Sequence, residues 1–99
     1  MLTIFNRQTV NATSRAFALS ADKKTRDNVD SERVIVPSGT FDGATLTVQV
    51  SANGVDFANM STNVLTEVNA EIIYLPNELY IRAVLAGVGA STDINLHVV

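Results

Sequence analysis

The sequence predicts an all-β domain, namely an antiparallel β-sandwich or flattened small barrel of about seven to eight short strands. One observation is that apolar and polar residues alternate with a period of two along much of the chain, as in strands that bury one face. A second is that turn-forming residues separate these alternating segments. A third is that no window shows the sustained apolar spacing of a helix. We therefore expect residues 1–99 to form a single β domain.

The expected strands lie at regular intervals along the chain. They are residues 2–6, 15–19, 33–36, 44–51, 55–59, 71–75, 79–85 and 93–98. Their alternation predicts which side chains point inward. We expect the core to contain Leu46, Val48, Val50, Ile81, Ala83, Leu85, Ile94 and Leu96.

Gly, Pro and Asn mark the connections between these strands. Asn53-Gly54 favours the positive φ angles of a tight hairpin turn, so strands 44–51 and 55–59 should pair directly. Pro37 should end the strand before it, because proline cannot donate to a ladder, and Asp42-Gly43 should redirect the chain into the next strand. Pro76-Asn77 predicts another hairpin, and the small residues 87–91 should link the last two strands.

Residues 20–33 depart from this pattern. The segment contains four basic and four acidic side chains, and its one large apolar residue is Val29, so we expect a mobile charged loop outside the core. Two interpretations stay open, a solvated connection or a loop that binds a charged partner surface. Under the second interpretation, the cations that would bind the partner are Lys23, Lys24, Arg26 and Arg33.

Composition narrows the class of protein. The chain has 99 residues, of which 46% are hydrophobic and 17% charged, which is typical of one folded domain and not of a disordered chain. It has no cysteine, so disulfides and thiolate metal sites are excluded. A net charge of −3 argues against a nucleic-acid surface, and no apolar run is long enough to span a membrane. The N-terminal residues do not resemble a signal peptide.

No motif for catalysis or for a cofactor is found. The single histidine, His97, lies on the polar face of the last expected strand and has no oriented partner in the sequence pattern. Asp27, Asp30 and Glu32 could suggest calcium, but the glycine and the spacing of a calcium loop are missing. Tyr74 and Tyr80 would favour a sugar-binding platform if both were exposed. We therefore expect a non-enzymatic protein without catalytic residues, cofactor or metal.

Two segments resemble small virion proteins of tailed bacteriophages. In the first, Phe41-Asp42-Gly43 precedes an alternating strand, and a Ser-x-Asn-Gly hairpin at residues 51–54 ends in the aromatic Phe57. The second begins with Leu75-Pro76, continues through a turn to Tyr80-Ile81-Arg82, and leads into the last pair of strands. The resemblance covers residues 39–97, and residues 1–38 match no family pattern.

The resemblance implies a virion structural protein, and a capsid decoration or cement protein is the favoured member of that class. Its partner would be the major capsid protein or another virion protein, and its location would be the capsid surface after synthesis in the host cytoplasm. A homo-oligomer is expected, with a trimer favoured over a dimer, and neither nucleic acid nor membrane is an expected partner. In this picture Asn53 and Gly54 form a projecting contact. Open alternatives are a tail or fibre component and a carbohydrate-binding or adhesive β-sandwich module.

Overall fold

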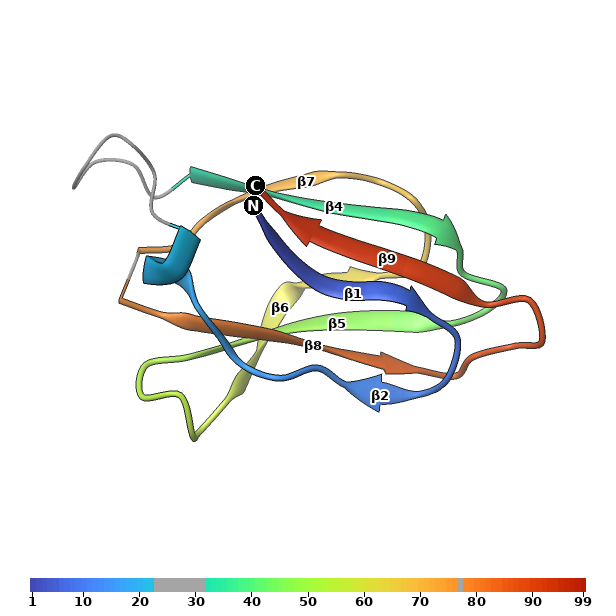
Figure 1. The fold of residues 1–99 in the computed structure, drawn as a ribbon, viewed down its shortest axis with the longest axis horizontal. Coiled ribbons are helices and arrows are strands. Elements are labelled where there is room, and N and C mark those ends of the chain that lie inside the picture. Colours follow the sequence, from blue (N-terminus) through green and yellow to red (C-terminus); the bar gives the residue numbers. More distant parts are fainter. Residues whose placement is uncertain (23–31, 77) are drawn as a thin grey trace.

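The computed structural model is all-β and consists of two antiparallel sheets packed face to face, which confirms the predicted sandwich (Figure 1). It describes residues 1–22, 32–76 and 78–99. These residues form nine strands, somewhat more than predicted, and one short helix: β1 (Leu2–Gln8), β2 (Ala12–Thr13), β3 (Phe17–Ala18), η1 (Leu19–Asp22), β4 (Glu32–Thr40), β5 (Thr45–Ser51), β6 (Ala58–Leu65), β7 (Glu71–Tyr74), β8 (Tyr80–Ala86) and β9 (Asp93–Val98).

The chain passes repeatedly from one sheet to the other. The four-stranded sheet has the order β1-β9-β4-β7, and the five-stranded sheet has the order β2-β8-β5-β6 with β3 also paired to β8. Only β5 and β6 are consecutive strands that pair with each other. The two termini lie side by side, because Leu2 pairs with Val98 in the four-stranded sheet (Figure 1).

The core lies between the sheets and contains the side chains that the alternation predicts. Leu46, Val48, Ile81, Ala83, Leu85, Ile94 and Leu96 are each exposed by 1% or less. Val50 is half-buried and packs against this cluster. Strands of both sheets therefore bury one face in a shared core, which stabilises a cysteine-free domain of this size.

Pro37 does not end its strand, contrary to the sequence prediction. β4 continues to Thr40, and Pro37 pairs with Leu96 of β9. Val34 and Val99 bond to each other in both directions, so even-numbered β4 residues direct their N–H groups toward β9. The backbone nitrogen of residue 37 is directed to the opposite edge of β4, where the pairing with β7 ends at Ile35. The missing N–H of Pro37 therefore costs no ladder bond.

Two other predicted connections and one predicted strand differ from the structure. The β5–β6 pair forms as expected, but β6 begins at Ala58 and not at residue 55, so the connection is a six-residue loop rather than a tight turn. The turn after Leu75 is not a hairpin, because β7 and β8 belong to different sheets; Asn77 itself lies outside the described residues. The predicted strand 15–19 is reduced to β3 and runs into η1.

The Asp42-Gly43 turn forms as predicted. Both residues have positive φ, 49° and 83°, and the Ala44 N–H donates to the Phe41 carbonyl at 2.9 Å. The turn takes the chain from β4 in one sheet to β5 in the other.

Candidate functional site

The two ends of the predicted charged loop, residues 20–33, belong to regular elements. Residues 20–22 belong to η1 and residues 32–33 begin β4. Lys23, Lys24 and Arg26, three of the predicted partner-binding cations, lie outside the described residues.

Arg33 is not on an exposed loop, so its assignment as a partner-binding residue is wrong. Its side chain is fully buried, and its Nε donates to the Leu75 carbonyl oxygen at 3.4 Å. Strand alternation explains this position, because Arg33 and Ile35 point inward while Val34 and Val36 are only half-buried on the other face. Residues 33–36 have apolar side chains at both odd and even positions, so the sequence could not indicate which face of the strand points into the core.

Asn53 and Gly54 lie in the connection between β5 and β6, which we call the 52–57 loop. A compact set of hydrogen bonds holds it. The Ser51 Oγ accepts the N–H groups of Asn53 and Gly54 at 3.2 and 2.9 Å. The Asn53 Oδ1 accepts those of Val55 and Asp56, both at 2.9 Å, and its Nδ2 donates to the Asp56 carboxylate at 3.0 Å. Asn side chains favour such local turns, so the loop has a defined shape without strand pairing.

Gly54 provides the positive φ that the sequence predicts, 80°, whereas Asn53 does not adopt one. A Cβ atom on Gly54 would lie 3.4 Å from three atoms of the Tyr80 ring. The glycine therefore lets the loop backbone pack directly on β8.

A polar ladder on the outer face of the five-stranded sheet anchors the base of the loop. The Phe57 ring lies 4.0 Å from the guanidinium carbon of Arg82, as a cation–π contact. The Arg82 Nε donates to the Gln49 Oε1 at 2.7 Å, and the Gln49 Nε2 donates to the Asn59 Oδ1 at 2.7 Å. These contacts join β6, β5 and β8, and the sequence did not indicate them because they depend on strand register.

The tip of the 52–57 loop presents an apolar side chain to solvent. Val55 is 77% exposed, the highest value among the exposed large hydrophobic residues described. The loop projects from one end of the sandwich, at the lower left of Figure 1. A fixed loop with an exposed valine can bury that side chain against a partner with little loss of conformational entropy.

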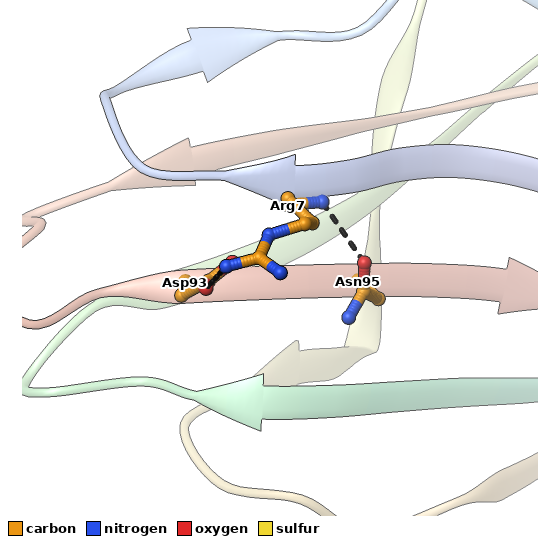
Figure 2. A network of polar contacts seen from close by, with 3 residues as sticks. All are labelled: Arg7, Asp93 and Asn95. Atoms are coloured by element: carbon orange, nitrogen blue, oxygen red, sulfur yellow. Dashed lines mark hydrogen bonds and ion pairs between the residues drawn. The ribbon is translucent and has the colours of Figure 1, made fainter.

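A second polar group lies on the outer face of the four-stranded sheet (Figure 2). Arg7 has a positive φ of 53° where the β1–β9 pairing shifts register, and its N–H donates to the Asn95 Oδ1 at 2.9 Å. Its guanidinium pairs with the Asp93 carboxylate at 2.9 Å. These contacts provide polar partners where the bulge interrupts the β1–β9 pairing, so we assign them a structural role.

The other candidate residues do not assemble into a site. His97 forms a 3.1 Å hydrogen bond with the Thr3 hydroxyl across β1 and β9. Tyr74 is 69% exposed, but Tyr80 is half-buried and lies in the other sheet, so the two do not share a face as a platform would require.

Residues 1–22, 32–76 and 78–99 form neither a metal-ligand cluster nor a membrane-spanning helix. Over these ranges no three His, Cys, Asp or Glu side chains are grouped to hold a metal ion. Asp27 and Asp30 of the calcium hypothesis lie outside the described part of the chain. No helix within it is long and apolar enough to cross a membrane.

Comparison of the chain with protein-family models, with curated proteins and with solved structures finds no match.

Proposed function

We propose that this protein is a non-enzymatic virion structural protein that binds the outside of a phage capsid and stabilises it. The observation that carries the proposal is the 52–57 loop, whose internal hydrogen bonds hold Val55 exposed at the end of a rigid sandwich. The loop falls within residues 39–97, the part of the chain that resembles small virion proteins of tailed phages.

A protein of this kind needs a stable scaffold and a modest contact that is repeated many times. Each copy binds weakly, but many copies on one shell act together and stabilise it against internal pressure. The proposed partner is the major capsid protein, and the proposed assembly on the shell is a homo-oligomer. Binding to a tail or fibre protein is the close alternative, because the same loop would suit that contact.

Binding to purified particles tests the proposal. The labelled protein is mixed with virions, empty shells and isolated tails of a phage that carries the gene, and bound protein is measured after sedimentation. We expect saturable binding to virions and shells. Binding to tails alone would favour the alternative, and binding to none of the three would contradict a virion role.

A matched pair of variants tests the loop. Burying a valine stabilises a contact by about 1.5 kcal/mol, so Val55→Lys should weaken shell binding about tenfold or more. Val68→Lys is the control, because Val68 is 51% exposed but lies in the β6–β7 connection. Equal binding by the two variants would exclude the 52–57 loop as the contact.

A further inference from the structure

The two outer strands of the four-stranded sheet differ in how they protect its edges. The pairing of β1 with β9 shifts register twice, and the exposed Arg7 lies on the irregular part of β1. Bulges and charges on an edge strand hinder pairing with another chain. β7 instead pairs with β4 through four consecutive residues without a shift, and its outward side chains are Ile72 and Tyr74.

The backbone of β7 presents hydrogen-bonding groups to its open side. Because Val34 bonds to Val99 in both directions, the odd-numbered residues of β4 bond toward β7. The β4 ladder therefore uses the N–H and C=O of Ile73. Those of Ile72 and Tyr74 point the other way, across an edge where the order of the described strands ends.

The side chains at this edge are apolar and exposed. Ile72 is 60% exposed and Tyr74 is 69% exposed. Ile72 lies opposite Val34, which in turn pairs with Val99, so an apolar row crosses the outer face of the sheet and ends at β7. An exposed, regular and apolar edge strand is a template for another strand.

We propose that β7 is a self-association strand, on which a second copy of this chain pairs antiparallel across a twofold axis centred on Ile73. In this register Ile72 lies opposite Tyr74 of the partner subunit. The outward N–H and C=O groups of Ile72 and Tyr74 in each copy therefore bond to the other copy. The outward side chains of the two copies meet on one face of the sheet. A shift of one residue would set outward side chains against inward ones. A shift of two residues would leave Ile72 or Tyr74 opposite a residue outside the strand. The strand is therefore complementary to itself in one register.

The size of the contact makes this a weak, reversible dimer. A tyrosine buries about 150–250 Å², so two copies of Ile72 and Tyr74 at their exposures have on the order of 500 Å² of side chain left to cover. A standard stable interface buries about 1,200–2,000 Å². We expect dissociation constants in the range of about 10 µM to 1 mM. This inference does not depend on capsid binding.

Sedimentation equilibrium of the full chain up to about 1 mM tests the proposal, since weak dimers form only at high concentration. We expect a monomer–dimer equilibrium, with concentration-dependent protection of the Ile72 and Tyr74 amides from hydrogen exchange. Ile72→Lys should weaken dimerisation by about 100-fold, because a symmetric interface loses the contact twice. Val10→Lys is the matched control, since Val10 is also 60% exposed but lies outside β7, and it should dimerise like the unmodified chain.

Several results would overturn the proposal. They are a monomer at the highest concentration, a dimer that Ile72→Lys leaves intact, a trimer, or protection elsewhere than at β7. Ile72→Lys should keep the circular-dichroism spectrum of the parent because the side chain is outside the core, and the double variant Ile72→Lys/Tyr74→Lys provides a second test. Loss of shell binding by Ile72→Lys in a monomeric protein would assign the edge to another partner.

Discussion

Gly39 and Gly43 offer a pair of substitutions that separates backbone strain from a steric collision. Both have positive φ, 102° and 83°. A Cβ atom at Gly43 would meet nothing within 4 Å, whereas one at Gly39 would overlap the Asp93 carbonyl oxygen and lie 3.1 Å from the carbonyl carbon. Asp93 belongs to β9, which pairs with β4 at Thr40, so relief of this overlap requires the two strands to move apart.

The expected losses of stability follow from these contacts. A residue with a Cβ atom in the left-handed region costs about 1–2 kcal/mol, which is the whole expected effect of Gly43→Ala. Gly39→Ala adds an overpacking term of about 1–3 kcal/mol, for a total of about 2–5 kcal/mol. A domain of this length has a free energy of unfolding of about 5–15 kcal/mol, so Gly39→Ala should remove a large part of it.

Urea and thermal unfolding, followed by circular dichroism, measure both variants. Each kcal/mol lowers the midpoint of a domain of this size by about 4–8 °C, so the two variants should differ by at least about 4 °C. Equal losses, or a larger loss for Gly43→Ala, would refute the argument that β9 excludes a side chain at position 39.

Further predictions concern the core, the loop and the charged residues. Val48→Asp should unfold the domain, because an unpaired buried carboxylate costs several kcal/mol, and a native circular-dichroism spectrum would contradict this. Asn53→Ala should speed hydrogen exchange at Val55 and Asp56 and cost about 1–2 kcal/mol, since both amides lose their acceptor; unchanged exchange would argue against the bonds described. Arg33→Ala should destabilise the domain by about 2–4 kcal/mol through a cavity and a lost hydrogen bond, whereas a binding defect with full stability would contradict its buried position. If residues 20–33 bind a charged partner surface, replacing Lys23, Lys24 and Arg26 with Ser should weaken shell binding in a salt-dependent way without lowering the thermal midpoint, and unchanged binding at low and high salt would exclude this segment from the contact.

The period-two pattern determined the fold class and most of the core. Leu46, Val48, Ile81 and Leu96 could be placed inside because strand alternation is a local property of neighbouring residues. Turn chemistry is equally local, so the turn at Asp42-Gly43 and the positive φ of Gly54 followed from the sequence.

Where both faces of a strand carry apolar residues, the sequence could not determine which face points into the core. Val34 and Ile35 are equally suited to a core, and only the packing of β4 between β7 and β9 placed Arg33 inside. The same neighbours allow Pro37 within a strand, because its missing N–H faces an unpaired side.

Strand partners were decided by tertiary structure alone. The sequence suggested a hairpin around Pro76, but the strands on either side of it belong to different sheets. Arg7 meets Asp93 from 86 positions away, and the Gln49–Arg82 contact joins residues 33 apart. The open edge at Ile72 and Tyr74 likewise exists because β7 is the last described strand of its sheet. Alternation fixes which face of a strand is apolar, whereas the choice of neighbour depends on how all strands share one core, which no local window of sequence contains.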